Sequence, residues 1–572
     1  MNDPAFDLVP ESSPRPRQAA SAAVLLLRTL AHRGVRVAFG IPGGSASPIF
    51  DGLNEVPEIR FVATRHEAMA GFAATGYARA TGRPALVLTT SGPGLTNAIT
   101  GMAAATLEEL PVIVLAGEIA SAAVARGGLQ DGSPAGLDTL GTVRSMTRWA
   151  TTLTSADAAS ATAERAWQLA TGERPGPVYV GVPLDVGSRV AAFRPPLATS
   201  DRPPAMPDLA ACDRAVQALR GARRPLLLLG NGARSASVAA RSLAERLSLP
   251  TAVTGHAKGV FPESHRLYLG LIGVGQHPSV SEYLREPPDV ACIVGSRLGD
   301  IATNGWQTPI AGTVDTIQID REALLLGRNV PVTLGIVGDA RATLEAMLEH
   351  CPAGVPPARD TPRCRSVRAE LAHSESMPLK PQRAIAALDR AFPGAIWCSD
   401  IGEHLTMALH YLRVDRPDRF HAMTGFGSMG SGIGAAIGMK LARPDATVIA
   451  LCGDGGLAMH AGEILTCVEH GLGVLFAVFN NGSWGMIDQG FRAVYGRLPP
   501  GMPSRVADLA AVARGFGAEG FVVRSAAELE PSSLQSLART GRPVVLDVRI
   551  DGTESLTCES RAATVRHFAQ GA

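Results

Sequence analysis

The sequence lacks most features that mark secreted, membrane-spanning or nucleic-acid-binding proteins. Its eight cysteines are scattered, with no CxxC pair and no zinc-ligand spacing, which favours reduced thiols in a cytoplasmic protein. No apolar run reaches the roughly 18 residues of a membrane-spanning helix without interruption by Gly, Pro or a charge. The formal net charge is +1, so charge gives no reason to expect nucleic acid or an acidic membrane as a partner.

The composition is that of a globular α/β protein. Hydrophobic residues make up 46% and charged residues 18% of the chain, and 572 residues are too many for a single core. Predicted strands and helices alternate along the whole chain, which indicates doubly wound parallel sheets in three Rossmann-like domains. We expect a disordered arm at 1–17, an N-terminal domain at 18–187, a central domain at 207–350, a linker at 351–380, a C-terminal domain at 381–550 and a tail at 551–572.

One stretch in the C-terminal third carries the strongest chemical signal. The apolar run Val448–Cys452 ends at Gly453–Gly456, a helical pattern follows, and a second apolar run, Val474–Phe479, ends just before Asn481. This order predicts a parallel β-α-β unit, whose two turns meet at one edge of the sheet. Asp454 in the first turn and Asn481 in the second then form a hard-oxygen pair suited to Mg²⁺ or Ca²⁺, and the glycines admit a diphosphate. Each turn alone reads as an ordinary Gly-rich or Asn-Gly turn.

Gly-Asp-Gly followed by an Asn-Asn pair resembles the thiamine diphosphate motif of decarboxylases and carboligases. The resemblance implies that Asp454, Asn481 and the carbonyl of Ser483 hold a Mg²⁺ that bridges the cofactor's diphosphate. Over about 20–550 the chain is similar to the acetolactate synthase (acetohydroxyacid synthase) group of large subunits. The landmarks of that group occur in order at Pro42-Gly43-Gly44, Ser91-Gly92-Pro93-Gly94, Arg174-Pro175-Gly176-Pro177, Pro262-Glu263, Val337-Gly338-Asp339 and Met429-Gly430.

The same resemblance implies a fold and a set of site residues. The three domains would be the pyrimidine, central and diphosphate domains, with the cofactor between subunits of a homodimer or homotetramer. The segment around Glu67 is similar to the one whose Glu hydrogen-bonds N1′ of the aminopyrimidine, although an isolated acid there also suits a helix N-terminus. Met429 would bend the cofactor or simply fill core space. The implied cofactor-binding residues are Gly44, Gly402, Glu403, His404, Gly427, Met429, Gly453, Gly455, Gly456, Ser483, Trp484, Gly485 and Met486.

The chain departs from the group where substrates would bind. A Trp that follows the Asn-Asn pair by nine residues in the group is Gly490 here, so the acceptor pocket should differ. Gln130, in Leu-Gln-Asp instead of Phe-Gln-Glu, is either a catalytic residue facing the substrate or a solvated loop residue. No His-His pair of the pyruvate decarboxylase type occurs, which favours carboligation over simple decarboxylation. His460 is either a core histidine or an acid near the substrate.

The sequence therefore predicts a thiamine diphosphate- and Mg²⁺-dependent enzyme. It would decarboxylate a 2-oxoacid, pyruvate first of all, and join the resulting carbanion to an acceptor carbonyl. The alternatives are a decarboxylase or C–C lyase of the same cofactor without carboligation, and a non-catalytic cofactor-binding protein. FAD is undecided, because Gly230–Gly232 and Arg297 match only part of a flavin-binding region. Asp320 is either a ribose-binding acid or a helix cap.

Overall fold

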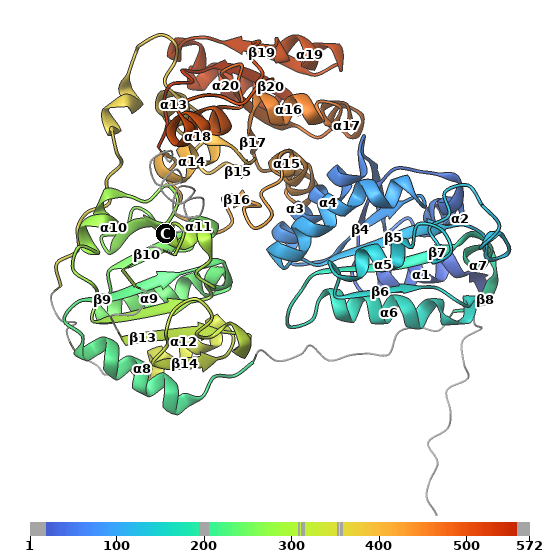
Figure 1. The fold of residues 1–572 in the computed structure, drawn as a ribbon, viewed down its shortest axis with the longest axis horizontal. Coiled ribbons are helices and arrows are strands. Elements are labelled where there is room, and N and C mark those ends of the chain that lie inside the picture. Colours follow the sequence, from blue (N-terminus) through green and yellow to red (C-terminus); the bar gives the residue numbers. More distant parts are fainter. Residues whose placement is uncertain are drawn as a thin grey trace, which may run out of the picture. The chain divides into compact units, whose positions relative to one another are not determined.

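The computed structural model describes residues 19–193, 205–306, 309–310, 315–351, 354 and 359–556. The chain divides into two compact units, Met1–Ala74 with Gly82–Thr199 and Thr75–Thr81 with Ser200–Ala572, which we describe separately (Figure 1). The arm expected at 1–17 and the tail beyond residue 556 lie outside the described residues. The three sheets of six strands that these units contain are all parallel, which confirms the predicted fold class.

The first unit contains one parallel sheet with the strand order β3-β2-β4-β5-β7-β6. Its inner strands β5 and β7 are buried at every residue and read as near-continuous apolar runs, as expected for a sheet covered on both faces. A short antiparallel pair, β1 (Ala19–Ser21) with β8 (Val190–Ala192), closes the unit. The sheet strands are β2 (Val37–Gly40), β3 (Arg60–Ala63), β4 (Ala85–Thr89), β5 (Val112–Glu118), β6 (Trp149–Thr152) and β7 (Pro177–Pro183). The helices that begin in this unit are α1 (Ala22–His32), α2 (Ser47–Gly52), α3 (Glu67–Thr81), α4 (Pro93–Glu108), α5 (Thr139–Arg144), α6 (Ala159–Ala170) and α7 (Leu184–Ser188).

The second unit begins with a central sheet ordered β11-β10-β9-β12-β13-β14. Alternate residues of β9 (Pro225–Leu229) enter different cores: Leu227 and Leu229 join one cluster, Leu226 and Leu228 the other. The sheet is therefore buried on both faces, as its leucine run predicts. The other strands are β10 (Thr251–Thr254), β11 (Tyr268–Ile272), β12 (Val290–Val294), β13 (Asp315–Asp320) and β14 (Leu334–Val337). The helices are α8 (Leu209–Gly221), α9 (Ser237–Leu247), α10 (Pro278–Tyr283), α11 (Asp300–Thr303) and α12 (Ala340–Glu349).

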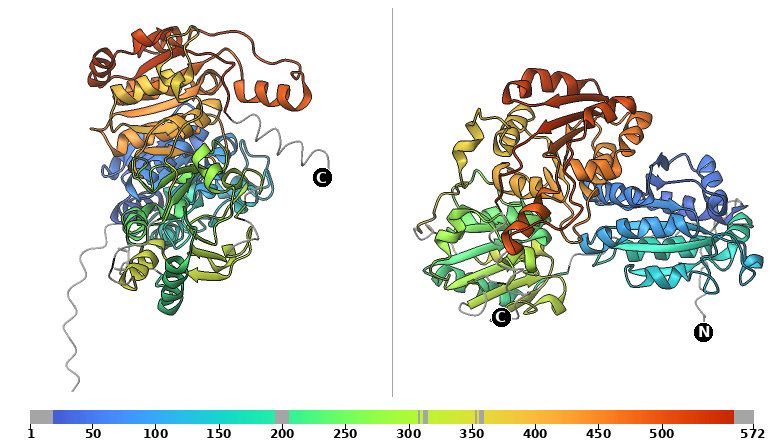
Figure 2. Two further views of the ribbon diagram at one scale, coloured as in Figure 1. Left: turned by 90° about the vertical axis from the view of Figure 1, so that its left-hand side faces the viewer. Right: turned by 45° about the horizontal axis from the view of Figure 1, so that its top comes forward.

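The same unit contains the sheet ordered β16-β15-β17-β18-β20-β19, with helices on both of its faces (Figure 2). The single helix expected after residue 453 is two, because α16 (Asp454–His460) ends at Ala461-Gly462 before α17 (Glu463–His470). The strands are β15 (Ile396–Ser399), β16 (Phe420–Ala422), β17 (Val448–Gly453), β18 (Val474–Asn480), β19 (Glu519–Val523) and β20 (Val544–Arg549). The remaining helices are α13 (Pro381–Ala391), α14 (Glu403–Tyr411), α15 (Ser431–Ala442), α18 (Gly485–Tyr495), α19 (Leu509–Gly515) and α20 (Pro531–Arg539).

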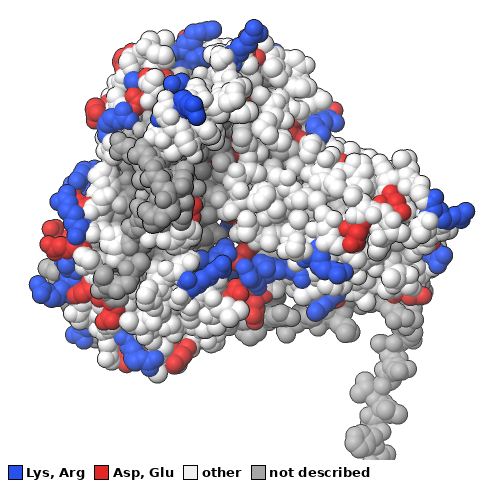
Figure 3. Space-filling model, viewed as in Figure 1, with Lys and Arg blue, Asp and Glu red and all other residues white. Residues whose placement is uncertain are grey.

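The surface and the thiols agree with the composition. On the face drawn in Figure 3, Lys and Arg are interspersed with Asp and Glu. Within the described ranges, every helix is too short or too polar to cross a membrane. The seven cysteines of the described ranges are free thiols, all buried except the half-buried Cys364. These thiols therefore contribute no covalent cross-link between them.

Candidate functional site

The site in the second unit is built where two neighbouring strands end. β17 and β18 pair in parallel with Gly453 opposite Phe479, so the turns after them lie side by side. Burial raises the pKa of Asp454, the first residue of α16, to about 6, although hydrogen bonds from the backbone N–H groups of Gly455 and Gly482 partly oppose this. Gly482 belongs to the turn after β18, so the carboxylate of Asp454 faces that turn. The convergence expected from the spacing is thus present in the fold.

The donors at this point fit a magnesium ion. Asp454 offers a half-buried carboxylate, and its partial burial makes it costly to ionise without a countercharge. Asn481 offers an amide oxygen, held by the N–H of Ser483 at 3.1 Å. The described part of the chain holds no group of three or more His, Cys, Asp or Glu side chains that could bind a metal. One carboxylate, one amide oxygen and a backbone carbonyl suit Mg²⁺, which keeps phosphate and water ligands, better than zinc.

Gly455 lies at the meeting point of two predicted site residues. A Cβ placed on Gly455 would stand 2.8 Å from Cδ1 and Nε1 of Trp484 and 3.3 Å from the methyl of Met429. The absence of a side chain therefore lets the indole and the thioether approach the turn. Met429 belongs to the loop before α15. Its approach to Gly455 therefore brings that loop next to the turn after β17.

His404 lies on the other side of the same turn. The imidazole packs against Gly402, and its Nδ1 would be 3.4 Å from a Cβ on Gly453. Burial lowers the pKa of His404 to about 4, so the ring is neutral near pH 7. Its Nε2 has no hydrogen-bond partner although it is buried, and the same is true of the hydroxyl of Ser428 in the loop before α15. Orphaned buried polar atoms such as these fit a site that receives a polar ligand group.

Glu403, the first residue of α14, is engaged by the segment that follows β20. Its Oε1 accepts hydrogen bonds from the hydroxyl of Ser555 and from the N–H of Leu556, both at 3.1 Å. The helix N-terminus stabilises a carboxylate at this position, but the carboxylate would repel a diphosphate. A cofactor contact by Glu403 stays a prediction, and the structure gives its carboxylate a second role as an anchor for residues 551–556.

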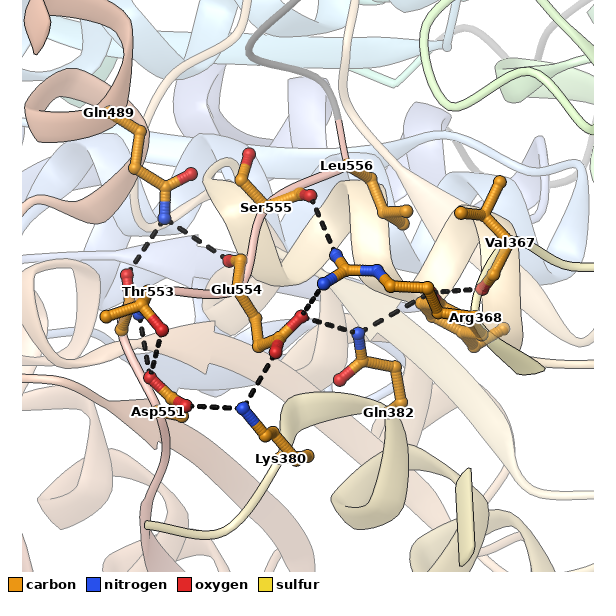
Figure 4. Close-up of polar contacts among 12 residues, drawn as sticks. Val367, Arg368, Lys380, Gln382, Gln489, Asp551, Thr553, Glu554, Ser555 and Leu556 are labelled. Carbon is orange, nitrogen blue, oxygen red and sulfur yellow. Dashed lines mark hydrogen bonds and ion pairs between the residues drawn. The ribbon is translucent and has the colours of Figure 1, made fainter. Parts of the chain in front are cut away.

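Figure 4 shows how that segment is held. Glu554 is buried and forms ion pairs of 2.8 Å with both Lys380 and Arg368. Lys380 also pairs with Asp551 at 2.7 Å. Gln489 on α18 donates to the carbonyl of Glu554 at 3.2 Å and to that of Gly552 at 2.9 Å.

The segment also touches a predicted metal ligand. A Cβ on Gly552 would stand 3.1 Å from Cβ and Nδ2 of Asn481. Residues 551–556 thus join the turn at Asn481 to the start of α14, where Glu403 lies. Cys558, Arg561 and Arg566, in the expected tail, lie outside the described residues.

The first unit carries a second group of predicted site residues, at the carboxyl edge of its sheet. Glu67 opens α3 and is only 7% exposed. Its Oε2 accepts a hydrogen bond of 3.0 Å from the amide of Asn97 on α4. Its Oε1 is 3.5 Å from a Cβ placed on Gly94, so the bare glycine keeps space beside the carboxylate. Glu67 is therefore oriented through Oε2, and its Oε1 borders the space beside Gly94.

Gln130 reaches the same edge. Its backbone has a φ of +60°, and its Cβ would be 3.1 Å from a Cβ on Gly92, in the turn after β4. Gly92 is two residues before Gly94, so Gln130 and Glu67 border one turn. The loop at Gly44 lies beside it, because the hydroxyl of Ser45 accepts from the N–H of Ser91 at 2.9 Å. Gln130 is half-buried, which favours a site residue over a fully solvated loop residue.

Two buried acids escaped the sequence reasoning. Asp400, after β15, binds the start of α15, and Glu118 ends β5. Burial raises the pKa of Glu118, whose Oε1 accepts from the hydroxyls of Tyr179 at 2.5 Å and Thr139 at 3.2 Å. The sequence does give a positional signal, because Glu118 ends an apolar strand and Asp400 directly follows one, both at the carboxyl edge of a parallel sheet. The remaining predicted residues lie nearby: Gly427 has a φ of +73°, and Gly485 and Met486 begin α18 beside Asn481.

Comparison with known proteins agrees with this geometry. Residues 20–137 match the thiamine pyrophosphate enzyme N-terminal TPP binding domain, 212–347 the central domain and 400–548 the C-terminal TPP binding domain. The acetolactate synthase isozyme 3 large subunit of Escherichia coli K12 is 33% identical over 93% of this chain and 95% of its own length. The acetolactate synthase of Arthrospira platensis is 32% identical over 93% of this chain and 95% of its own length. The large subunit from Corynebacterium glutamicum is 31% identical over 92% and 86%.

Family similarity spans all three sheets and both groups of site residues, and no large part of the chain is left without a counterpart. The relatives are matched along nearly their whole length, so the similarity is not confined to one domain. The chain therefore belongs to the thiamine pyrophosphate-dependent enzymes, in the group of acetolactate synthase large subunits.

Proposed function

We propose that this enzyme decarboxylates a 2-oxoacid, pyruvate first of all, and transfers the two-carbon unit to an acceptor carbonyl, with thiamine diphosphate and Mg²⁺. The observation that carries the proposal is the convergence of Asp454 on the turn that contains Asn481. A carboxylate and an amide oxygen at the ends of paired strands, beside a Gly-rich turn, suit a magnesium diphosphate. The similarity to acetolactate synthases supports the choice of reaction.

The chain's own residues would bind and orient the cofactor. Asp454, Asn481 and the carbonyl of Ser483 would hold Mg²⁺, and the orphaned Nε2 of His404 would meet the diphosphate. Met429, whose methyl lies beside Gly455 in the turn, would support the aminopyrimidine. When bound, thiamine diphosphate would supply a nucleophilic thiazolium carbon and an electron sink for the decarboxylation of the 2-oxoacid.

Glu67 would exchange a proton with the aminopyrimidine ring of the cofactor. Its buried carboxylate, fixed by Asn97 on one oxygen, can share a proton with a weakly basic ring nitrogen through the other. Proton exchange with the ring nitrogen needs a carboxylate such as that of Glu67. Its presence therefore favours a catalytic protein over one that only binds the cofactor. In the family the two groups of site residues come from different subunits, so we propose a homodimer or homotetramer, which light scattering of the purified protein tests.

Product analysis tests the reaction. The protein is supplied with thiamine diphosphate, Mg²⁺ and pyruvate, either without a further substrate or with an added aldehyde or second 2-oxoacid. The products are identified by mass spectrometry. We expect CO₂ together with a 2-hydroxy-2-methyl-3-oxo acid from pyruvate alone. Lack of pyruvate consumption in the presence of both cofactors contradicts the proposal.

One observation favours simple decarboxylation as the second candidate. The ring of His460 lies directly against Gly430, since a Cβ on that glycine would stand 2.1 Å from Cδ2 of the imidazole. Gly430 follows Met429, so His460 is close to the loop that would support the cofactor. A proton donor there would release an aldehyde instead of a ligated product. Acetaldehyde as the main product from pyruvate would establish this alternative.

Gly230 and Asp320 of the central domain make contacts that serve its fold. A Cβ on Gly230 would be 2.2 Å from the carbonyl oxygen of Gly295, so close packing of two strand ends explains this glycine. Asp320 accepts a hydrogen bond of 3.1 Å from the N–H of Glu322, as in a local turn. These contacts serve the fold whether or not FAD is present. The absorbance spectrum of the purified protein shows directly whether a flavin is bound.

A further inference from the structure

Asp400 holds the start of α15. Its side chain is completely buried, and its Oδ2 accepts a hydrogen bond of 2.8 Å from the N–H of Gly430. Its Oδ1 accepts one of 3.2 Å from the N–H of Gly432 and lies 3.4 Å from the hydroxyl of Ser431. The N–H groups at a helix start lack partners within the helix, so a carboxylate satisfies them and the helix dipole favours its charge. The loop that ends here carries Met429.

The same carboxylate reaches the turn after β17. A Cβ on Gly456 would stand only 2.5 Å from Oδ2 of Asp400. A Cβ on Gly432 would stand 2.3 Å from the backbone N of Asp400. The start of α15, the residue Asp400 and the turn Gly453–Gly456 therefore pack without any intervening side chain. A shift of Asp400 changes the spacing between the loop and the turn.

We propose that Asp400 is a positioning residue that fixes the loop 427–430 relative to the turn Gly453–Gly456. This inference rests on the proposed function, in which the loop supports the aminopyrimidine end of the cofactor and the turn receives its diphosphate. Asp400 itself would not touch cofactor or substrate. Asp400 would set the distance between the loop 427–430 and the turn Gly453–Gly456, which hold the two ends of the cofactor. A small misplacement of reacting groups has a large effect on rate.

The geometry requires two acceptor oxygens. Gly430 and Gly432 donate to different oxygens of the carboxylate, which an amide cannot reproduce, because its NH₂ group would face one of the two N–H groups. Asp400→Asn has the same shape and is not expected to open a cavity. The loop would lose one of its two backbone anchors and move, while Asp454 and Asn481 would stay in place.

Two measurements on Asp400→Asn test the inference. Amide hydrogen exchange by mass spectrometry, with thiamine diphosphate and Mg²⁺ present, should be faster in a peptide spanning 427–434 and little changed in one spanning 454–460. In the pyruvate assay, kcat should fall by about tenfold or more while the cofactor Kd stays within about threefold. Asp208→Asn is the matched control. Asp208 caps α8 through the N–H of Ala210 at 2.9 Å, so its variant should alter neither measurement.

Unchanged exchange at 427–434 overturns the inference. So does an equal loss of kcat and cofactor affinity with a lower unfolding temperature, because that combination describes a residue needed only for stability. If the wild-type protein binds the cofactor but consumes no 2-oxoacid, the proposed function fails by itself. The exchange measurement then still decides whether Asp400 holds the loop.

Discussion

The carboxylate of Glu403 accepts a hydrogen bond of 3.1 Å from the hydroxyl of Ser555, although the two residues are 152 positions apart in the chain. This contact ties the segment after β20 to the first turn of α14. The ion pairs of Glu554 with Lys380 and Arg368 hold the same segment from its other side. The last described residues are thus bound to the first turn of α14, which carries the predicted cofactor-binding residues Glu403 and His404.

Glu554→Gln should destabilise the protein. The side chain of Glu554 is 7% exposed, and the substitution removes its charge while Lys380 and Arg368 remain. Loss of hydrogen bonds to charged groups predicts a decrease of about 1–3 kcal/mol in the free energy of unfolding. Urea unfolding measures it. Glu519→Gln, which breaks the exposed pair with Arg542, is the control and should cost less than about 1 kcal/mol. Equal costs for the two variants would contradict the expectation.

Asp454→Asn should separate metal binding from folding. The amide keeps the shape of the side chain but removes the carboxylate that accepts a hydrogen bond from Gly482 in the turn after β18. We expect the Mg²⁺-dependent affinity for thiamine diphosphate to fall by roughly a hundredfold, about 3 kcal/mol. Calorimetric titration with and without Mg²⁺ measures this. A variant that binds the cofactor as tightly as the wild type would remove Asp454 from the metal site.

Gly455→Ala should disturb the same turn by steric contact. The added Cβ would stand 2.8 Å from the ring of Trp484, which must then move. Overpacking of this kind costs about 1–3 kcal/mol, so cofactor affinity should fall by roughly tenfold. The change in tryptophan fluorescence on titration with thiamine diphosphate and Mg²⁺ reports it. Gly490→Ala on α18 is the control, because its Cβ meets nothing within 4 Å. Normal affinity in Gly455→Ala would show that the turn tolerates a side chain.

Glu67→Gln should lower the rate while the cofactor still binds. Gln can accept the hydrogen bond from Asn97 but cannot exchange a proton with a ring nitrogen. Loss of general acid–base catalysis predicts a kcat reduced by about 10²- to 10⁴-fold. Steady-state kinetics with pyruvate, together with a cofactor titration, measures both effects. Glu58→Gln, an exposed acid in the same unit, should leave both unchanged. An unaltered kcat in Glu67→Gln would exclude Glu67 from the mechanism.

The buried pair of His277 and His410 should make stability decrease on acidification. The rings stack at 4.3 Å, and burial lowers the pKa of both; Lys258 adds to the effect on each ring, and His410 adds to the effect on His277. The N–H groups of Leu271 and Val367 donate to one nitrogen of each ring, which must stay unprotonated. Unfolded histidine takes up a proton near pH 6.5, whereas these rings resist it to lower pH. The contribution of these two neutral rings to the free energy of unfolding is therefore complete above about pH 6.5 and declines as the pH falls below that value.

Urea unfolding at about pH 7.5 and 5.5 measures this slope. His277→Gln should reduce it, whereas substitution of the exposed His373 should not. The carboxyl of Asp400 acts in the opposite direction: burial raises its pKa to about 6, so its protonation on acidification relieves a cost. A stability that increases from pH 7.5 to 5.5 would show that such carboxyls outweigh the histidines.

Residues whose role depends on strand order were predictable from the sequence. Asp454 and Asn481 each follow an apolar run, and parallel pairing of consecutive strands brings such positions together. The prediction of Glu67 came from similarity to a family segment, and the structure adds the partner Asn97, which no spacing indicates. Whether these residues bind the cofactor as inferred stays a prediction.

Other features depend on contacts between distant segments and could not be predicted. The orientation of Glu403 follows from a segment about 150 residues later, and the sequence treated Glu403 only as a neighbour of the diphosphate. The sequence pattern assigned no role to Asp400, and only the fold shows two N–H groups pointing at it. The break between α16 and α17 also escaped, since the apolar spacing continues across Ala461-Gly462.

The buried thiols of the second unit can report on local opening of its sheets. Cys292 in the central sheet and Cys398 and Cys452 in the last sheet are fully buried, and burial raises the pKa of each thiol. Alkylating reagents attack accessible thiolates, so each of these cysteines reacts only when its own sheet opens. The sequence has no cysteine before Cys212, so the first unit adds no background. The order in which these thiols react would therefore reveal which of the two sheets opens first.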